Sequence, residues 1–415
     1  MSQYLDFVDL KYNPKKSDLI VLFRVEPARG ISKKEAIGRV AAESSNGTWT
    51  TLSTLKPHIR KIRARAFKLN GNNVKIAYPL ELFEQGNIPQ LMSSIAGNIF
   101  GMKAVRNLRL EDIYFPKEYV KHFKGPQFGI KGIRKYMKIK NRPMIATVPK
   151  PKVGLTTKEH TKVILDSWTG GVDFAKDDEN LTSQNFNKFE ERVKQAAKAR
   201  DKAEKITREK KDYFINISAE TDEMIRRAEI VKNYNFKYVM ADILTVGWSG
   251  IQTLRKETQH LKLAIHAHRA FHAAFDRNPK HGMSMLALAK ISRLTGVDNI
   301  HIGTVVGKLV GNKKEVLNIQ KGITSNMHGI KDTIPVSSGG LHPGLIPYII
   351  KTLGNDIVLQ AGGGIHGHPK GSKQGAKAVR QSMNATLNNI SLKNYSKSNP
   401  ELKIALKKWE KTKPI

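Results

Sequence analysis

Residues 170–179 of this chain, GGVDFAKDDE, place a lysine and three carboxylates directly after a short apolar run. The run 172–175 is typical of a buried strand. Carboxylates at such a strand end are costly to keep charged unless a cation lies between them, and Mg²⁺ prefers oxygen ligands of this kind. Lys176 would repel that metal as an ammonium group, but as a carbamate formed with CO₂ it would supply an anionic oxygen. The segment therefore predicts a magnesium site with a carbamylated lysine.

The same segment has a simpler interpretation as a solvated charge run in the first turn of a helix. Acidic residues are common there because they interact favourably with the helix dipole. Residues 170–179 alone do not decide between the two interpretations. The rest of the chain favours the metal site.

A strand followed by a polar or glycine-rich loop and then an amphipathic helix recurs eight times after residue 143. The predicted strands are 144–148, 172–175, 213–217, 238–241, 263–266, 299–302, 333–336 and 357–360. Eight such units in sequence indicate a closed (β/α)₈ barrel, a TIM barrel. Chemistry in these barrels lies on the loops that follow the strands, so reactive residues there are candidates.

The chain before the barrel has a different character. Strand-like segments at 18–25 and 73–78 alternate with helical ones at 32–43 and 88–98, which predicts a smaller α+β domain. The stretch 124–143, rich in Gly, Lys and Pro, is predicted to be a linker. We expect an N-terminal domain at 1–135, the catalytic barrel at 136–392 and a basic C-terminal tail at 393–415.

Lys150 and Lys152 follow the first predicted strand, with a proline between them. A pair of this kind in a lysine-rich chain is usually a surface feature. Beside an anionic metal site, however, a lysine can deliver a proton to a substrate or stabilise an oxyanion.

The fifth predicted strand ends in His266, His268 and Arg269, and His272 follows. An arginine at the centre disfavours a transition-metal site, so a phosphate or proton-transfer role fits better. Packing of histidines in a helix cap stays open, above all for His266 and His272.

The sixth predicted strand leads through His301 into residues 303–311, GTVVGKLVG. Three glycines around the single cation Lys308 are typical of a lid that closes on bound substrate. The spacing does not match a Walker motif. A plain surface loop is the alternative, although it would leave its valines and leucine exposed.

Glycine clusters follow the last two predicted strands. Ser338, Gly339 and Gly340 follow the seventh, and Gly362 and Gly363 follow the eighth. Bare backbone amides after these two strands form the phosphate site of many barrels. With His301 and Arg269 across the mouth, the barrel offers two anion sites, one on each side of the metal, which suits a short sugar bisphosphate.

Composition sets wider limits. The 415 residues contain no cysteine, which excludes disulfides and thiolate metal sites. No apolar run is long enough to span a bilayer, and we expect a soluble, cytoplasmic protein. The 71 Lys+Arg against 36 Asp+Glu give a net charge of +35, which makes nucleic-acid binding a rival hypothesis. The basic residues are spread along the whole chain, however, and this disfavours a nucleic-acid-binding protein.

Taken in order, these motifs resemble the large subunit of ribulose-1,5-bisphosphate carboxylase/oxygenase (RuBisCO) from about residue 41 to about residue 371. Residues 43–50, ESSNGTWT, and 97–101, GNIFG, resemble family segments that reach the active site of a neighbouring subunit. The resemblance therefore implies a homodimer with shared sites and leaves open an assembly of such dimers. It implies no small subunit and no membrane.

The resemblance implies a role for each matched residue. Lys176 corresponds to the carbamylated lysine, and Asp178 and Glu179 to the other Mg²⁺ ligands. Lys150 corresponds to the lysine that protonates the product carbanion, and Lys152 supports it. His268 resembles the histidine near the reacting carbons, and Lys308 the lysine that stabilises the incoming carboxylate.

The remaining matches imply substrate binding. Arg269, His301 and Ser338 correspond to contacts with one phosphate and the hydroxyls. Thr48, Trp49, Gly340, Gly362 and Gly363 belong to the set for the other phosphate, and Gly339 is a further substrate-binding match. Glu43, Thr48, Trp49 and Asn98 would come from the partner subunit.

The implied reaction adds CO₂ to ribulose-1,5-bisphosphate through an enediolate stabilised by Mg²⁺ and yields two 3-phosphoglycerates, with O₂ as a competing reactant. Residues 266–275 and the short chain are more similar to the archaeal form III group, which is linked to AMP and nucleoside monophosphate salvage. RuBisCO-like enolases or isomerases of sugar phosphates are the alternative, and the presence of Lys308 argues against them. Val310 departs from the family pattern, because many relatives have Glu there.

Overall fold

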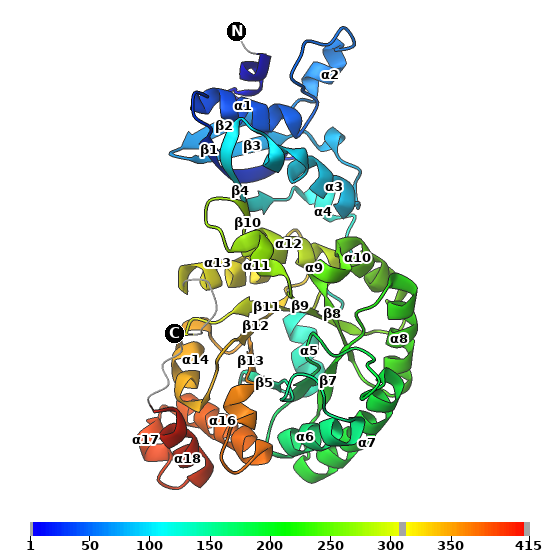
Figure 1. The fold of residues 1–415 in the computed structure, drawn as a ribbon, viewed down its shortest axis with the longest axis vertical. Helices are drawn as coiled ribbons and strands as arrows, with labels where there is room; N and C mark the ends of the chain where they lie inside the picture. Colours follow the sequence, from blue (N-terminus) through cyan, green and yellow to red (C-terminus); the bar gives the residue numbers. More distant parts are fainter. Residues whose placement is uncertain (1–2, 307–312, 411–415) are drawn as a thin grey trace. The chain divides into compact units, whose positions relative to one another are not determined.

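The computed structural model describes residues 3–306 and 313–410, which form two compact units (Figure 1). The first unit contains the described residues up to Lys124 together with Phe271–Leu294 and Asn326–Ile330. The second contains Gly125–Ala270 and the described parts of Thr295–Ser325 and Lys331–Ile415. The domain boundaries expected at 135/136 and 392/393 stay predictions.

The first unit is built on a five-stranded sheet. Its strands are β1 (Leu19–Pro27), β2 (Arg65–Asn70), β3 (Asn73–Tyr78), β4 (Val105–Tyr114) and β10 (Gly282–Met283), in the order β10-β4-β1-β3-β2. β10 pairs with β4 in parallel, and the other pairs are antiparallel. Alternate residues of β1 are buried, beginning with Leu19, Val21 and Phe23, as expected of a sheet with one face on a core.

Helices of the first unit include α1 (Lys33–Glu43), α2 (Pro57–Lys61), α3 (Ile88–Ile95), α4 (Lys117–Val120), α11 (His272–Asp276) and most of α12 (Met285–Thr295). Short 3-10 turns lie at η1 (Gln3–Phe7), η2 (Leu80–Leu82) and η3 (Asn98–Gly101). The Ser32 side chain accepts a hydrogen bond from the backbone N–H of Glu35, so Ser32 is the N-cap of α1. The α+β prediction for this region is confirmed.

The second unit contains a closed parallel barrel of eight strands in the order β11-β12-β13-β5-β6-β7-β8-β9. The strands are β5 (Met144–Thr147), β6 (Phe174–Lys176), β7 (Asp212–Asn216), β8 (Tyr238–Asp242), β9 (Ala264–His268), β11 (Asn299–Gly303), β12 (Ile334–Ser338) and β13 (Val358–Gln360). Each lies within two residues of its predicted bounds. The predicted barrel is confirmed.

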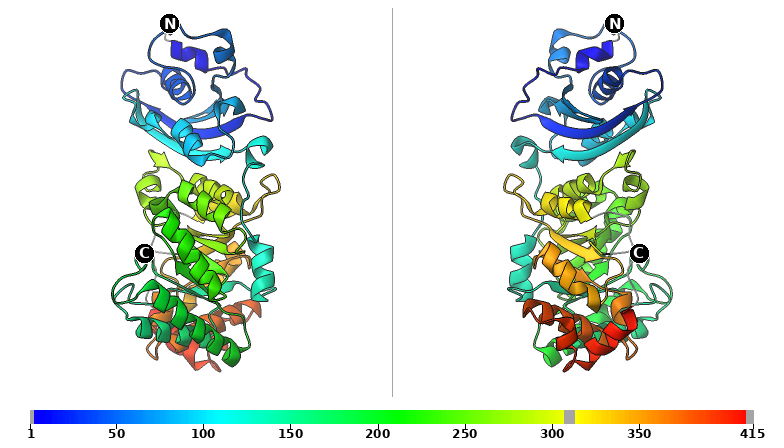
Figure 2. Two further views of the ribbon diagram at one scale, coloured as in Figure 1. Left: turned by 90° about the vertical axis from the view of Figure 1, so that its right-hand side faces the viewer. Right: turned by 90° about the vertical axis from the view of Figure 1, so that its left-hand side faces the viewer.

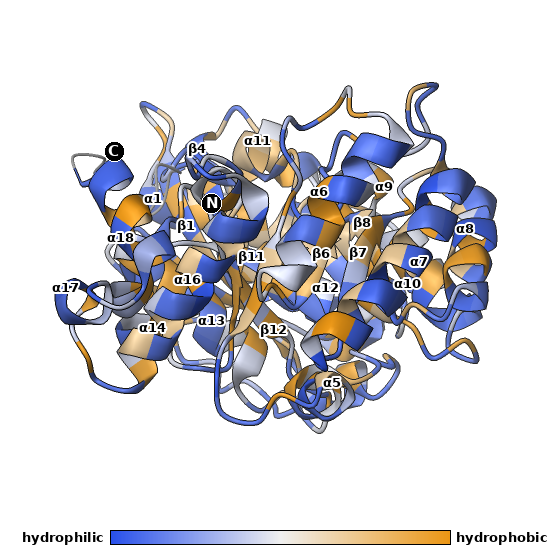
Figure 3. Ribbon diagram, turned by 90° about the horizontal axis from the view of Figure 1, so that it is seen from below, coloured by the Kyte–Doolittle hydropathy of each residue, from blue (hydrophilic) through white to orange (hydrophobic). Residues whose placement is uncertain are grey.

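The barrel strands are almost wholly buried, since helices cover them. These helices are α6 (Thr157–Thr169), α7 (Phe189–Thr207), α8 (Thr221–Asn233), α9 (Ile243–Val246), α10 (Trp248–Glu257), α13 (Lys313–Thr324), α14 (Ile346–Leu353) and α16 (Ser372–Leu387), with shorter turns at η4 (Pro343–Leu345) and α15 (Gly363–His366). Figure 3 shows the apolar strands enclosed by helices such as α7 and α8, which carry hydrophilic residues. Among the described residues, none of the helices combines the length and apolarity needed to cross a bilayer.

Part of the predicted linker at 124–143 is instead a helix, α5 (Gly129–Met137). Ile130, Ile133 and Met137 are buried in one cluster with barrel residues such as Phe174 and Tyr238. The helix therefore closes the amino end of the barrel with an apolar plug. Tyr136 packs against the same cluster, and residues 130, 133 and 137 have the i, i+3, i+7 spacing of one helical face. The Gly and Lys residues between them favoured a linker instead.

Two carboxylates hold the start of α5 in place. Asp298 Oδ1 accepts from the backbone N–H groups of Phe128 and Gly129 at 2.7 and 3.0 Å. Asp332 Oδ1 accepts from the N–H of Ile130 at 2.9 Å. These bonds satisfy backbone donors that a helix leaves free at its N-terminus.

The C-terminal segment forms α17 (Leu392–Tyr395) and α18 (Pro400–Trp409). Leu402 and Ala405 of α18 are buried, and α18 packs against α16, as the views in Figure 2 also show. The stretch expected to be a basic tail therefore includes a helix that packs on the barrel unit.

Candidate active site

A cavity of about 630 Å³ lies at the carboxyl ends of the barrel strands. Several loops that follow different strands contribute to it, as expected of a TIM-barrel active site. Eleven residues predicted from the sequence line this one cavity: Lys150, Lys152, Asp178, Glu179, His268, His301, Ser338, Gly339, Gly340, Gly362 and Gly363.

Lys176 is the last residue of β6 and is fully buried beside this cavity. Its Nζ donates to the backbone carbonyl of Asp177 at 2.8 Å and lies 3.9 Å from Glu179 Oε2. Burial lowers the pKa of Lys176, although the negative charges of Glu179 and Asp242 oppose the shift. The site therefore favours the neutral amine more than water does.

The two carboxylates next to Lys176 face cations. Lys150 Nζ donates to Asp178 Oδ2 at 2.8 Å, and Lys152 Nζ lies 3.7 Å from Glu179 Oε1. His268 Nε2 lies 3.6 Å from Glu179 Oε2. Burial by itself would raise the pKa of Asp178, but the hydrogen bond and charge of Lys150 outweigh it and lower that pKa. Asp178 is thus held as a carboxylate.

Asp177, the third carboxylate of the segment, is fully buried and has separate partners. It accepts a short hydrogen bond from the Tyr213 hydroxyl. Arg192 Nε lies 3.3 Å and His160 Nε2 3.4 Å from its Oδ1. Burial would raise the pKa of Asp177, but Arg192 and His160 lower it. This carboxylate is therefore an internal anchor of the loop.

Asn216 ties the same loop to the end of β7. Its backbone N–H donates to Asp177 Oδ2 at 2.9 Å. Its side-chain amide donates to the carbonyls of Asp178 at 3.4 Å and Glu179 at 3.1 Å. Since Asn216 is fully buried, these bonds fix the backbone that carries the two cavity carboxylates.

Three histidines lie on neighbouring strands. His266 Nε2 is 3.0 Å from His301 Nε2, and His301 Nδ1 is 2.7 Å from Ser338 Oγ. His268 Nδ1 is 2.6 Å from Asp242 Oδ1. Burial is the main cause that lowers the pKa of all three histidines. They are therefore neutral imidazoles near pH 7, able to accept or pass a proton.

The two glycine clusters pack against each other at the edge of the cavity. Gly339 and Gly340 have φ angles of 115° and 70°, a region that favours glycine. A Cβ on Gly364 would lie 2.0 Å from the carbonyl oxygen of Leu341. The loops after β12 and β13 therefore approach as closely as they do only because glycine is present.

Several cavity residues were not predicted. Asp242, the partner of His268, directly follows the predicted strand 238–241, so the rule used for the other strands could have found it. Gln360, which lines the cavity, is the last residue of the predicted strand 357–360 and falls outside that rule. Lys408 and Trp409 of α18 also line the cavity. The Trp409 ring stacks on His342 at 5.6 Å between centroids, and no local sequence signal indicates this contact.

Arg269 is not among the residues that line this cavity. Arg269 is buried, and a Cβ on Gly303 would lie 3.1 Å from its Nη2, so it lies beside the end of β11. Lys308 falls outside the described residues, as does Val310.

The four remaining predicted residues belong to the first unit. Glu43 ends α1, and its Oε1 accepts from the Tyr4 hydroxyl at 3.1 Å. Thr48 lines a cavity of about 160 Å³ within this unit, and Trp49 is 80% exposed. Asn98 begins η3.

The donor set beside the cavity fits a hard cation once Lys176 is modified. Within residues 3–306 and 313–410, no three His, Cys, Asp or Glu side chains are grouped so as to hold a metal ion. Asp178 and Glu179 supply two carboxylates, and Lys176 lies beside them. A carbamate on Lys176 would complete three oxygen ligands, the type that Mg²⁺ prefers.

Family models match both parts of the chain. The model of the ribulose bisphosphate carboxylase large chain, catalytic domain, matches residues 129–409, and the model of its N-terminal domain matches residues 6–119. The chain belongs to the RuBisCO large-chain family. The sequence resemblance to this family is thereby confirmed.

Curated relatives agree along the whole length. The ribulose bisphosphate carboxylase of Pyrococcus furiosus is 53% identical over 415 residues, which cover 99% of each chain. That of Methanocaldococcus jannaschii is 47% identical and covers 98% of this chain and 100% of its own. Identity of about one half over the full length to RuBisCO chains supports an enzyme of the carboxy-lyase class.

Solved RuBisCO structures share the fold. The octameric RuBisCO of Pyrococcus horikoshii in complex with sulfate has a TM-score of 0.95 and 51% identity, and covers 99% of this chain and 97% of its own. The dimeric archaeal RuBisCO of Hyperthermus butylicus has a TM-score of 0.91 and 48% identity, and covers 98% and 99%.

Proposed function

We propose that this protein is a ribulose-1,5-bisphosphate carboxylase with an oxygenase side reaction. The observation that carries the proposal is the gathering of Lys150, Asp178, Glu179 and His268 around one cavity, with Lys176 buried behind them. Carboxylase names on relatives about half identical over the full length support it.

The residues that would hold Mg²⁺ are Lys176 as a carbamate, Asp178 and Glu179. A neutral amine is the form that reacts with CO₂, so the lowered pKa of Lys176 favours the modification. When bound, the metal would polarise substrate oxygens and so acidify the adjacent carbon.

Other side chains supply proton transfer and positioning. Lys150 is within reach of the carboxylates and is proposed to donate a proton to the product carbanion, with Lys152 beside it. His268, oriented by Asp242, is proposed to be the histidine that lies near the reacting carbons of the substrate. Lys308 is proposed to stabilise the new carboxylate.

Substrate phosphates are proposed to bind on two sides of the cavity. Gly339, Gly340, Gly362 and Gly363 present backbone amides on one side. Arg269, His301 and Ser338 are proposed to bind the other phosphate and the hydroxyl groups of the substrate. The buried hydrogen bond between His301 and Ser338 holds two of these groups in a fixed orientation.

A homodimer with shared sites is proposed, in which the partner subunit supplies Glu43, Thr48, Trp49 and Asn98. The 80% exposed Trp49 supports this assembly, because exposed indoles are frequent anchors of interfaces. One similar RuBisCO structure is a dimer and another is an octamer. Whether dimers of this chain assemble further is therefore left open.

The pathway proposed for the enzyme is AMP and nucleoside monophosphate salvage in the cytoplasm. The support is the resemblance of residues 266–275 to archaeal form III chains and the archaeal origin of the similar relatives. Nucleic-acid binding is not proposed as its function.

The test is incorporation of ¹⁴CO₂ into acid-stable product from ribulose bisphosphate, with and without preincubation in bicarbonate and Mg²⁺. We expect fixation that depends on preincubation in the wild type and is lost in Lys176→Ala. Lys198→Ala, which removes an exposed lysine of α7, is the matched control and should fix CO₂ normally. Consumption of the bisphosphate by a folded wild type without fixation would instead indicate an enolase-like protein.

A further inference from the structure

A second cavity, of about 640 Å³, lies at the opposite end of the barrel from the candidate active site. Its residues precede the strands: Arg142 precedes β5, Asp173 precedes β6, Glu209 precedes β7 and Asn355 precedes β13. These four strands are neighbours in the barrel, so one cavity collects all their entry loops. The remaining lining residues are Met137, Lys138, Ile139, Lys140, Asn141, Arg208, Lys210 and Leu387.

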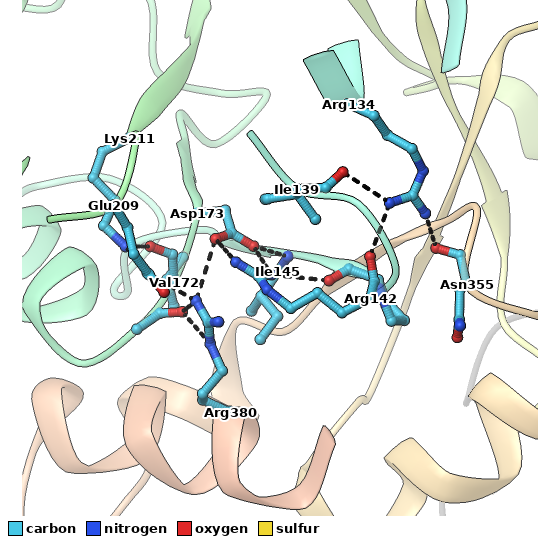
Figure 4. Close-up of polar contacts among 12 residues, drawn as sticks. Arg134, Ile139, Arg142, Ile145, Val172, Asp173, Glu209, Lys211, Asn355 and Arg380 are labelled. Carbon is cyan, nitrogen blue, oxygen red and sulfur yellow. Dashed lines mark hydrogen bonds and ion pairs between the residues drawn. The ribbon is translucent and has the colours of Figure 1, made fainter. Parts of the chain in front are cut away.

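Both carboxylates of this cavity are neutralised by cations from within the fold (Figure 4). Arg142 donates to the two oxygens of Asp173 at 2.7 Å each. Arg380 Nη2 lies 3.3 Å from Asp173 Oδ1 and 3.0 Å from Glu209 Oε2, and Lys211 Nζ lies 2.8 Å from Glu209. Arg142, Arg380 and Lys211 thus face two carboxylates. This cluster of five charged side chains therefore carries a net positive charge.

Three further lining residues, Lys138, Lys140 and Arg208, are exposed cations that no carboxylate balances. We call them the rim cations. In the part of the chain that the structure describes, their side chains form no hydrogen bond or ion pair. By contrast, the neighbouring Lys210 is paired with Glu204 at 3.0 Å. The open side of the cavity is therefore strongly positive.

The backbone at two of these cations is unusual. Lys138 and Arg208 have φ angles of 56° and 55° at the C-terminal ends of α5 and α7, positions where glycine or asparagine is usual. The helix dipole favours a cation near such an end. It does not account for Lys140, which lies outside both helices, nor for the convergence of all three on one cavity.

We propose that this cavity binds a small phosphorylated organic anion. The rim cations suit a phosphate group, and Met137, Ile139 and Leu387 provide an apolar wall for the rest of the molecule. The volume is typical of small-molecule sites. A concave pocket of this size favours a small ligand over a nucleic acid, and the proposal does not rest on the carboxylase activity.

The test uses the full-length protein with uridine 5′-diphosphate as the probe and uridine as its uncharged control. Hydrogen exchange locates the probe, because the candidate active site and this cavity use different segments. We expect protection of residues 138–142 and 208–211 by the diphosphate and none by uridine. Protection confined to residues 338–340 and 362–364 would overturn the proposal.

Two triple variants separate the cavity from general charge. Lys138→Gly, Lys140→Ala and Arg208→Gly remove the rim cations, and glycine suits the two left-handed positions, so folding is retained. Lys194→Ala, Lys198→Ala and Lys202→Ala remove the same charge from exposed sites on α7. We expect the dissociation constant at the cavity to rise at least tenfold in the rim variant and less than twofold in the α7 variant.

An equal rise of the dissociation constant for the diphosphate in both triple variants would overturn the proposal. It would show that the net charge of the protein attracts the diphosphate without a specific site. Protection of residues 138–142 by single-stranded RNA without protection by the diphosphate would overturn it in favour of a nucleic-acid surface. Carboxylation measured on the same wild-type sample keeps the two questions apart, because its failure would count against the proposed function alone.

Discussion

Lys150 Nζ lies 2.8 Å from Asp178 Oδ2, so the lysine proposed to donate a proton is paired with a proposed metal ligand. The lysine side chain is 31% exposed and that of the aspartate 2%, so the lysine is the partner that can move. A metal ion bound at Asp178 Oδ2 would compete with this ammonium group.

Lys150→Met should tighten Mg²⁺ binding in the presence of bicarbonate at least tenfold while it lowers carboxylation at least 100-fold. Two unit charges about 4 Å apart interact by about 4 kcal/mol at an effective dielectric constant near 20, and solvent screens part of this. Lys152→Met is the matched control and should have a smaller effect, because Lys152 is 58% exposed and lies 3.7 Å from Glu179. Calorimetric titration with Mg²⁺ measures both, and weaker binding in Lys150→Met would contradict the competition.

Asn216→Ala should lower the free energy of unfolding by about 1–3 kcal/mol, since it leaves two buried loop carbonyls without their donor. The loop carrying Asp178 and Glu179 should then be less well ordered, with a further loss of carboxylation. Denaturant unfolding and the CO₂ assay are the measurements. Asn388→Ala, at an exposed position, should change neither, and an unaltered Asn216→Ala protein would refute the anchoring role.

Gly364→Ala should destabilise the protein by about 1–3 kcal/mol or more, because its Cβ would collide with the Leu341 carbonyl. Gly363→Ala is a sharp comparison, since a Cβ there meets no atom within 4 Å. We expect Gly363→Ala to fold normally and to raise KM for the bisphosphate if its amide contacts phosphate. Equal unfolding midpoints for the two variants would show that the loops can separate.

Asp212 predicts a pH dependence of stability. Burial raises its pKa to about 6, with the Tyr136 hydroxyl and backbone donors opposing part of the shift. Because the folded pKa exceeds the unfolded value of about 3.9, the stabilising contribution is complete below about pH 4 and is lost as pH rises through about 6. The total is on the order of 3 kcal/mol.

Asp212→Asn should therefore flatten the change in unfolding free energy between pH 4 and pH 6.5. The slope is the readout, since the amide also changes hydrogen bonds to Tyr213 and Lys237 at every pH. Parallel curves for the variant and the wild type would show that Asp212 titrates normally.

The sequence was sufficient for the barrel because each strand is a short apolar run bounded by polar loops, and that pattern is local. It did not lead to α5, because the Gly and Lys residues of 124–143 favoured a linker although Ile130, Ile133 and Met137 have helical spacing. The strands against which this face packs lie far along the chain, and no local pattern indicates them. The three carboxylates of residues 177–179 show the same limit. Their spacing did not indicate that Asp177 is held by Tyr213 and Arg192.

The cavity residues divide in the same way. Those directly after predicted strands could be predicted, and Asp242 beside His268 would have followed from the same rule. Lys408 and Trp409 could not, because a contact between α18 and the loop after β12 depends on packing of the C-terminal helices. The rim cations of the second cavity were likewise indistinguishable from other surface lysines.

The apolar plug that α5 forms at the amino end of the barrel has a kinetic consequence. Strand side chains such as Phe174 and Tyr238 fill the barrel interior, and Ile130, Ile133 and Met137 cover its amino end, so the mouth is the one way to the candidate site within this unit's described residues. Under the proposed function, the substrate would enter and both product molecules would leave through that opening. Product that has not departed therefore blocks the next turnover, and 3-phosphoglycerate should inhibit competitively against the bisphosphate.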